Sequence, residues 1–323
     1  MIFKFKEPSN KTKEVMSEVA KGNIDTDFES EAEAKINKIT NHKFVKLTNS
    51  GNASIFLAIA STEGPIIIPD QGGWNGFKQV ANYLNRDIIT LKTDYGFINT
   101  DYLEDIDEGN LILTSFAGYT AEQDIKAIYD ICSDKNITLI EDASAGLGDD
   151  KNILGNGKYA DIIVASTGSP KIINVGNGGF ISTDNPDVLE KTRILQKIVK
   201  INEITASGVC VELENIDKKL NTTINACNYL KNNLDDVIHA DKRGLNVIIK
   251  DAKPKDFSWN LKKELKTDKK GFITKCPNYN RIKEKAVAIE IKNLDYNCLK
   301  KEYLDKIIEI IEKNKTEKIS NQQ

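Results

Sequence analysis

Short apolar runs alternate with longer stretches of helical periodicity from residue 44 to residue 183. The apolar runs are four to six residues long and rich in β-branched side chains, which is typical of buried strands. The predicted strands are 44–47, 65–69, 87–91, 111–115, 136–141, 161–165 and 179–183. The helices predicted between them are 52–61, 74–84, 100–106 and 121–134. This alternation, with its short connections, predicts an α/β fold whose mostly parallel sheet is covered by helices on both faces.

The two ends of the chain show a different pattern. Helical periodicity precedes the first strand at 10–21 and 27–40, and long helical stretches follow the last one at 186–199 and 216–234. A smaller mixed region leads to a final helix at 301–314, and its predicted strands are 245–250, 271–275 and 286–291. We therefore expect an N-terminal arm and first helix at 1–42, a large domain at 43–200 and a small C-terminal α+β domain at 201–323.

Composition narrows the class of protein. Lys plus Arg number 45 against 48 Asp plus Glu, so the formal net charge of −3 gives no basis for a nucleic-acid partner. The five cysteines show no C-x-x-C spacing and the two histidines are isolated, so we expect no metal site. No run reaches the roughly 20 apolar residues that a transmembrane helix needs. Because the cysteine number is odd and no apolar leader follows Met1, we expect a cytoplasmic protein without a membrane partner.

Loops at the carboxyl ends of four predicted strands carry the candidate chemistry, because open parallel sheets bind ligands at that edge. In the first loop, Ser50, Gly51 and Asn52 lie directly between a strand and a helix. A helix N-terminus with small residues suits a phosphate, although Ser and Asn are also ordinary N-caps. In the second loop Trp74 lies among three glycines, so its ring either stacks on an aromatic ligand or anchors the loop in the core.

The third loop begins with two adjacent carboxylates, Glu141 and Asp142, at the end of an apolar strand. A buried aspartate in such a place needs a cationic or hydrogen-bonding partner, because an unpaired buried charge is costly. A protonated pyridine nitrogen is one such partner. The alternative is that Asp142 caps the next helix.

The fourth loop presents Lys171 between two strands, with Ser166 as a further phosphate ligand. Pro170 and the glycines around it indicate a sharply bent backbone. Lys171 is either a solvated surface lysine or a Schiff-base nucleophile whose pKa is lowered by its surroundings. Together the four loops offer phosphate ligands, an aromatic ring, an anion and an amine, which is the set that a pyridoxal 5′-phosphate (PLP) site requires.

The motifs in these loops resemble those of the DegT/DnrJ/StrS family of PLP-dependent aminotransferases, which are fold-type I enzymes. SGNAS at 50–54 is similar to the family's Ser-Gly-Thr-Ala-Ala segment, and EDAS at 141–144 is similar to its Glu-Asp-Ala-Ala segment. Ser166, Lys171 and the glycine pair at 178–179 match the family's Ser-x-x-x-x-Lys motif and the Gly-rich turn after it. The resemblance covers residues 28–200.

The resemblance implies a large domain with a seven-stranded mixed sheet, a small C-terminal domain, and a homodimer with active sites at the subunit interface. Lys171 would carry the cofactor as a Schiff base, Asp142 would pair with the pyridinium nitrogen, and Trp74 would stack on the ring. The phosphate would be bound by Ser50, Gly51, Asn52 and Ser166. The implied activity is transfer of an amino group from an amino acid to a carbonyl acceptor, by family default a keto-sugar nucleotide.

Departures from the family pattern leave a second function open. Ala145 and Leu147 stand where the family has Gln and often His, so a hydrogen bond to the cofactor's phenolic oxygen is missing or comes from elsewhere, with Gln71 as a candidate. The family's Asn-Tyr-Arg segment is not recognisable at 206–213. The alternative is another fold-type I PLP enzyme, such as a lyase, a sulfur-transfer enzyme or an enzyme that modifies a carrier-bound amino acid. A desulfurase needs a mobile cysteine, for which Cys210 and Cys276 are candidates because they lie outside the predicted helices.

Overall fold

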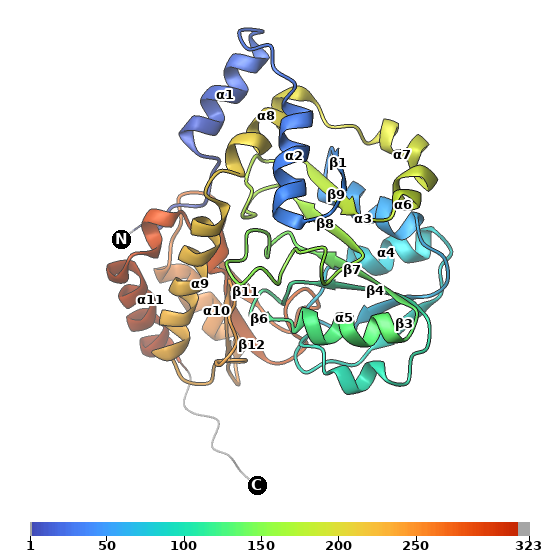
Figure 1. Cartoon of the computed structure of the whole chain (residues 1–323). Helices are drawn as coiled ribbons and strands as arrows, with labels where there is room; N and C mark the ends of the chain where they lie inside the picture. The colour runs from blue at the N-terminus through green and yellow to red at the C-terminus, as the bar shows by residue number, and fades with distance from the viewer. Residues whose placement is uncertain (1, 316–323) are drawn as a thin grey trace.

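A seven-stranded sheet forms the centre of the larger part of the computed structural model, which describes residues 2–315 (Figure 1). The strand order is β1-β9-β8-β7-β4-β2-β3. The strands are β1 (Phe44–Thr48), β2 (Ile66–Pro69), β3 (Ile88–Leu91), β4 (Gly109–Thr114), β7 (Ile137–Asp142), β8 (Ile162–Ser166) and β9 (Gly179–Thr183). Within this sheet β9 alone runs in the direction opposite to the other six strands. The prediction of an α/β fold with a mostly parallel sheet of seven strands is confirmed.

The register of the sheet brings several loops together at its carboxyl edge. Asp142 at the end of β7 pairs with Thr114 of β4 on one side and with Val164 of β8 on the other. Because β1 is antiparallel to β9 and β9 is antiparallel to β8, β1 runs in the same direction as β8. The loops that follow β1, β2, β4, β7 and β8 therefore leave the sheet on one side.

Both faces of the sheet are apolar, because alternate residues of a buried strand point to opposite sides. Ile66 and Ile68 pack on the face covered by α3 (Gly51–Ala60) and α4 (Gly76–Tyr83). Ile67 between them packs in the core of the other face. That second core takes residues from α2 (Phe28–Thr40), α5 (Ile125–Asp134) and α8 (Glu203–Glu212).

The smaller part contains an antiparallel sheet with the order β10-β12-β11. Its strands are β10 (Val247–Lys250), β11 (Ile273–Lys275) and β12 (Ala286–Ile289), and its helices are α9 (Ile216–Asn232), α10 (Pro254–Glu264) and α11 (Lys301–Asn314). The N-terminal arm joins this core, because the backbone N–H of Phe3 donates to the Lys266 carbonyl at 2.9 Å and the Phe3 ring is buried there. The arm then leads into α1 (Asn10–Ala20), which packs against α8.

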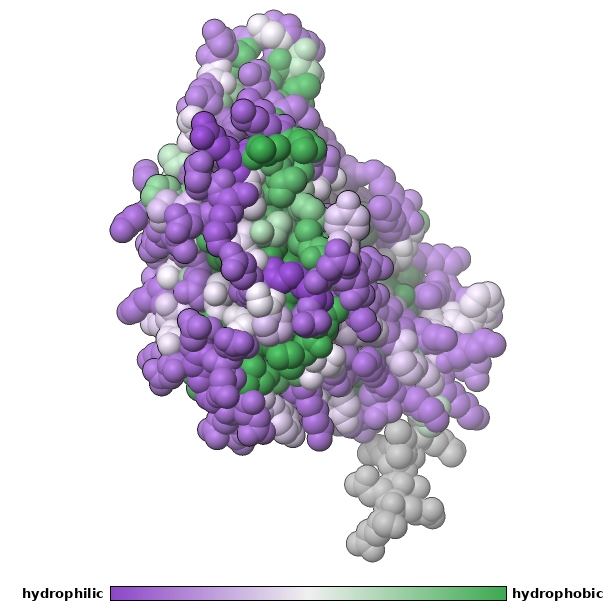
Figure 2. Space-filling view, turned by 90° about the vertical axis from the view of Figure 1, so that its right-hand side faces the viewer, coloured by the Kyte–Doolittle hydropathy of each residue, from purple (hydrophilic) through white to green (hydrophobic). Residues whose placement is uncertain are grey.

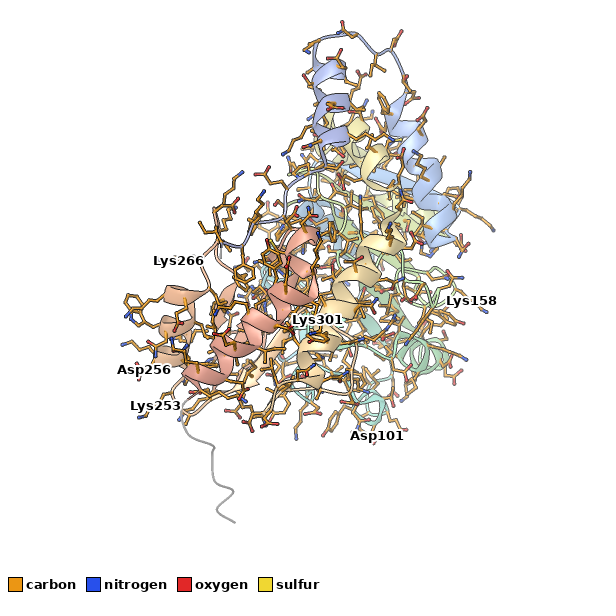
Figure 3. The ribbon with its side chains drawn as sticks, turned by 90° about the vertical axis from the view of Figure 1, so that its left-hand side faces the viewer. Asp101, Lys158, Lys253, Asp256, Lys266 and Lys301 are labelled. Atoms are coloured by element: carbon orange, nitrogen blue, oxygen red, sulfur yellow. The ribbon has the colours of Figure 1, made fainter. Side chains whose placement is uncertain are left out.

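Charged side chains cover the outer surface of the smaller part. Figure 3 shows Lys253, Asp256 and Lys266 at the outer edge of the smaller part, and Lys301 at the start of α11. All four are exposed. These charged side chains of the smaller part are therefore in contact with solvent.

Several elements differ from the sequence prediction. The helix expected at 121–134 begins at Ile125, because Ala121–Glu122 (β6) pairs with Phe116–Ala117 (β5) in a short hairpin. The helix expected at 186–199 is two short helices, α6 (Pro186–Lys191) and α7 (Arg193–Ile198). The segment at 100–106 contains only a short 3₁₀ helix at Thr100–Leu103, and two more follow at Ile291–Asn293 and Tyr296–Leu299.

Two helices, α8 and α10, were missed by the periodicity argument. Eight of the ten residues of α8 are buried, so the helix has no polar stripe from which a period could be recognised. Cys210 lies inside α8, so the expectation that it falls outside the helices is wrong, whereas Cys276 lies in a non-helical segment.

None of the helices in the described part of the chain is long and apolar enough to cross a membrane.

Candidate active site

A cavity of about 240 Å³ lies at the carboxyl edge of the large sheet, and we call it the site cavity. Its lining includes six of the seven residues that the sequence singled out, which are Gly51, Asn52, Trp74, Asp142, Ser166 and Lys171. The seventh, Ser50, does not line it. The Ser50 hydroxyl instead accepts a hydrogen bond from the backbone N–H of Ala53 at 3.2 Å, so this residue is the N-cap of α3. The fold therefore brings these six residues into one cavity although some of them are more than 100 positions apart in the chain.

The N-terminus of α3 packs directly on the end of β8. A methyl group added at Gly51 would lie 2.4 Å from Cβ of Ser166, so only glycine permits this approach. The first backbone N–H groups of a helix have no partner within the helix, and the helix dipole is positive there. Gly51, Asn52 and Ser166 thus form a cradle of small residues that is suited to an anionic group such as a phosphate.

Asp142 is held at the end of β7 by its own loop. Its Oδ1 atom accepts hydrogen bonds from the backbone N–H of Ser144 at 3.0 Å and from the Ser144 hydroxyl. The same hydroxyl accepts the backbone N–H of Ser166 at 2.8 Å, which ties Asp142 to the anion cradle. The Asp142 carboxylate therefore has a fixed orientation and remains available to a cation in the cavity.

The neighbouring carboxylate, Glu141, has a structural role. It accepts hydrogen bonds from the Ser115 hydroxyl at 2.6 Å and from the backbone N–H of Gly155 at 2.9 Å. Burial raises the pKa of Glu141 to about 7, and the side chain is fully enclosed. Glu141 thus supports the loop, whereas the adjacent Asp142 lines the cavity.

The loop that carries Lys171 folds back on itself. The Lys171 N–H donates to the Gly168 carbonyl at 2.9 Å, and the Val175 N–H donates to the Thr167 carbonyl at 2.9 Å. The Lys171 ammonium donates a hydrogen bond to the Tyr119 hydroxyl at 2.6 Å. Lys171 is therefore not a solvated surface lysine, because its amine is fixed inside the site cavity.

The pKa of Lys171 differs from the sequence expectation. Burial acts to lower it, but the Tyr119 oxygen and the Asp142 carboxylate outweigh burial, so the pKa of Lys171 lies above its usual range. The expectation of a lowered pKa is therefore wrong for the amine in this setting. Burial by itself lowers the pKa of a lysine, whereas nearby anionic partners raise it, and these partners are not evident from the sequence.

Trp74 lies on the loop between β2 and α4. Its ring covers the backbone of Gly76, where an added methyl group would lie 1.9 Å from a ring atom, and it meets the Phe77 ring edge to face at 5.8 Å. Tyr279 of the smaller part holds this loop, since its hydroxyl donates to the Pro69 carbonyl at 2.8 Å. Trp74 is thus anchored against the helix and also lines the cavity, whereas stacking of its ring on a ligand stays a prediction.

Gln71, the candidate replacement for the family's Gln, points elsewhere. Its Oε1 atom accepts the backbone N–H of Lys283 at 2.7 Å, and it is not part of the cavity lining. Ala145 and Leu147 are buried in the core. Of the two candidate cysteines, neither Cys210 nor Cys276 lines the site cavity.

The lining residues that the sequence did not predict include Tyr119, Asn280 and Arg281. Arg281 forms a two-point ion pair with Glu290, with Nε–Oε1 2.7 Å and Nη2–Oε2 2.8 Å. Asn280 accepts the backbone N–H of Asn75 at 3.1 Å, which closes the segment onto the Trp74 loop. The chain has only four arginines, and one of them lies in the segment Asn-Tyr-Asn-Arg. This rare residue in a turn is the sequence feature that could have predicted this side of the cavity.

Comparison with known proteins gives two family matches. Residues 9–261 match the model of the DegT/DnrJ/EryC1/StrS aminotransferase family. Residues 217–312 match the MJ1341 family C-terminal domain. A curated relative, the uncharacterized protein MJ1066 of Methanocaldococcus jannaschii, is 34% identical over 86 residues, which are 27% of this chain and 22% of that protein. The chain thus aligns with only about a fifth of that relative.

Solved structures similar to this one include PseC of Helicobacter pylori, an aminotransferase involved in the biosynthesis of pseudoaminic acid. It is 13% identical with a TM-score of 0.80, and the alignment covers 97% of this chain and 99% of that one. The putative sugar aminotransferase Spr1654 of Streptococcus pneumoniae is 14% identical with a TM-score of 0.77, over 97% and 98%. A SepCysS–SepCysE N-terminal domain complex gives 18% identity and a TM-score of 0.73, over 97% and 95%. At these identities the matches show a shared fold.

Proposed function

Because this chain belongs to the DegT/DnrJ/EryC1/StrS aminotransferase family, we propose that it is a PLP-dependent aminotransferase that moves an amino group from an amino-acid donor to a carbonyl acceptor. The observation that carries the proposal is that Lys171 and Asp142 line one small cavity together with the N-terminus of α3. The family default for the acceptor is a keto-sugar nucleotide.

The residues of the site cavity fit the cofactor group by group. Gly51, Asn52 and Ser166 would hold the phosphate, because a side chain larger than glycine at position 51 would fill the cradle. Trp74 would stack on the ring, and Asp142 would keep a proton on the ring nitrogen. Ser50 would contribute by capping α3 and so fixing the direction of its N-terminus.

PLP, when bound, supplies a ring that accepts the electron pair left behind when a substrate carbon loses its proton. Lys171 would first bond to the cofactor and later, once released by the amino donor, would move that proton as a base. Lys171 is half-buried and lines the site cavity, so its amine would face a group bound there. The carboxylate of Asp142, which is held in a fixed orientation, stabilises the positive charge of the Lys171 ammonium.

We further propose that the protein acts as a homodimer. No residue of α7 is buried, and the apolar side chains of Ile194 and Ile198 are 76% and 71% exposed. Figure 2 faces the side of the molecule that carries α7 and shows apolar residues gathered in a band between polar borders. A second copy of the chain is the partner that the family resemblance implies for such a surface. A mass determined by light scattering that corresponds to one chain at micromolar concentration would contradict this part of the proposal.

A trapping experiment tests the central proposal. The protein is incubated with PLP, treated with borohydride and digested, and the modified peptide is identified by mass spectrometry. We expect modification at Lys171, complete loss of it in Lys171→Ala, and retention in the control Lys250→Ala, because Lys250 also meets a tyrosine hydroxyl but lies outside the site cavity. Wild-type protein that takes up no PLP would exclude the function.

A second function, another reaction of the same cofactor, is favoured by Ala145 in place of the family's Gln and by the likeness to SepCysS. Incubation of the PLP-loaded protein with glutamate separates the two. Aminotransfer yields 2-oxoglutarate in an amount equal to the enzyme, whereas a lyase or sulfur-transfer enzyme leaves glutamate unchanged. Since neither candidate cysteine lines the cavity, a desulfurase that uses Cys210 or Cys276 is the weakest of these alternatives.

A further inference from the structure

Tyr119 has a backbone conformation that is unusual for an aromatic residue. It lies in the turn of the β5–β6 hairpin, where the Thr120 N–H donates to the Ala117 carbonyl at 2.8 Å. The two central residues, Gly118 and Tyr119, have φ values of +54° and +64°. Such a turn favours glycine, asparagine or aspartate at both positions, and a bulky side chain there is strained.

The smaller part of the molecule holds this strained turn in place. The Tyr119 carbonyl accepts two backbone N–H groups, from Leu245 at 2.7 Å and from Asn246 at 2.9 Å. Gly118 lies against the segment opposite, and an added methyl group there would be 2.8 Å from the Arg281 carbonyl oxygen. Strain of this kind persists where the surroundings enforce it, and it is common where a side chain has a functional position.

The phenol that is presented in this way meets the amine of Lys171. The Lys171 Nζ donates to the Tyr119 hydroxyl oxygen at 2.6 Å. Two further cations lie over the same ring, with the Arg281 guanidinium carbon 4.8 Å and the Lys292 ammonium 4.6 Å from its centroid. Negative charge on the phenol oxygen is therefore stabilised from several sides.

We propose that Tyr119 is the proton-exchange partner of Lys171, a role that rests on the proposed function of the site. One proton moves along the existing hydrogen bond, so that a neutral amine and a phenol become an ammonium and a phenolate. No other reagent is needed. Tyr119 thereby holds the amine in place whenever Lys171 is free, and it stabilises the charge that the amine gains when it takes up a substrate proton.

The charged groups around the pair are consistent with this exchange. They are Asp142, Arg281 and Lys292, with Glu290 behind the two cations. Burial acts to raise the pKa of Tyr119, but Lys171, Lys292 and Arg281 outweigh it, so this pKa lies below its usual range. Asp142 opposes that shift from the other side of the amine.

A second tyrosine and lysine pair provides a matched control. Tyr95 also has a positive φ, +47°, and its hydroxyl receives a hydrogen bond from Lys250 Nζ at 3.1 Å. The Lys250 ammonium lies 4.8 Å from the Tyr95 ring centroid. This pair lines a different cavity, so Tyr95→Phe removes the same chemical group from a similar backbone without touching Lys171.

The test uses two readouts on wild type, Tyr119→Phe and Tyr95→Phe. The first is the ultraviolet tyrosinate titration of the protein without added PLP. We expect wild type and Tyr95→Phe to show one tyrosine that ionises at lower pH than the others, and Tyr119→Phe to lack it. If all three proteins titrate alike, the proposal is wrong, whether or not the site binds PLP.

The second readout is the pH dependence of the rate at which PLP becomes trappable on Lys171. Because Tyr119 raises the pKa of Lys171, its removal frees the amine at lower pH, so the midpoint of the profile shifts to lower pH in Tyr119→Phe. The profile of Tyr95→Phe stays with that of wild type. An unshifted profile in Tyr119→Phe overturns the proton-exchange role but leaves the aminotransferase proposal standing, whereas absence of trapping in wild type removes the proposed function itself.

Discussion

Lys171 and Lys6 are two enclosed amines in different regions of the molecule, and their surroundings differ in one respect. Lys171 lies in the site cavity with a phenol oxygen 2.6 Å from its Nζ and the Asp142 carboxylate nearby. Lys6 lies in the N-terminal arm, 2% exposed, with its ammonium 4.7 Å from the Tyr296 ring centroid. Among the described residues no hydrogen-bond acceptor meets the Lys6 Nζ. The Lys171 amine thus has a hydrogen-bond partner and a nearby carboxylate, whereas the Lys6 amine is enclosed without a hydrogen-bond acceptor.

The pKa values of the two amines move in opposite directions as a result. Burial, reinforced by the positive charge of Lys292, lowers the pKa of Lys6 to about 7. At Lys171 burial acts in the same direction, but the anionic partners reverse the outcome. Enclosure alone therefore does not identify a catalytic lysine. The combination of enclosure with a positioned acid favours the proposed role of Lys171.

The first prediction removes the carboxylate that distinguishes the two regions. Asp142→Asn keeps the shape of the side chain but takes away the charge that opposes Lys171 and would hold a proton on the cofactor ring. We expect the rate of the glutamate half-reaction to fall by roughly 10² to 10³-fold, the usual cost of losing one positioned electrostatic group. PLP should remain trappable at Lys171, because the amine is still present.

The matched control for this change is Asp187→Asn, an exposed acid in the first turn of α6. Single-turnover formation of 2-oxoglutarate measures the rate, and thermal unfolding checks that both variants are folded. A rate in Asp142→Asn within threefold of the control would show that the carboxylate is not what separates Lys171 from Lys6.

The residues of the site were predictable where they depend on the large sheet. Asp142, Ser166 and Lys171 follow buried strands that the apolar runs identify, and parallel strands place their loops at one edge. The N-terminus of α3 was predictable in the same way, although the contact of Ser50 was not, because capping and cofactor binding use the same residue types.

The missed residues depend on packing between regions that are distant in the chain. Tyr119 faces Lys171 only because Leu245 and Asn246 hold its turn, more than 120 positions later in the sequence. Arg281 reaches the cavity from a loop of the smaller part that no periodic pattern describes. Sequence periodicity reports the faces of an element, but it does not report which distant loop closes over a site.

The second prediction concerns the enclosed amine without partners. Replacing Lys6 by methionine keeps a long flexible side chain and removes the buried charge. We expect the free energy of unfolding at pH 7 to rise by roughly 1 to 4 kcal/mol, the range found when buried ion pairs are replaced by apolar residues. Urea unfolding of Lys6→Met against wild type measures it, and Lys4→Met, an exposed lysine of the same arm, is the control.

The sign of the pH dependence sharpens this prediction. The pKa of Lys6 is about 7 in the folded chain and 10.5 in the unfolded one, so the unfolded chain binds more protons between these values. Wild-type stability therefore gains a contribution as the pH rises through this window, and the penalty is complete below it. The advantage of Lys6→Met should shrink from pH 7 toward pH 10.5. A constant difference across this range would mean that Lys6 has a partner, and the comparison with Lys171 would fail.

The smallest effect is expected from the Tyr296 hydroxyl. This hydroxyl is buried and meets no hydrogen-bond partner among the described residues, while its ring lies under the Lys6 ammonium. Tyr296→Phe keeps the ring and removes the unpaired group, so we expect the free energy of unfolding to rise by up to about 1 kcal/mol. In the control, Tyr229→Phe, the lost hydroxyl donates to Asp305 at 2.5 Å, so this variant should lose stability instead. If Tyr296→Phe also loses stability, the Tyr296 hydroxyl stabilises the Lys6 ammonium. Lys6 and Lys171 would then both have partners, and they would differ only in the charge of those partners.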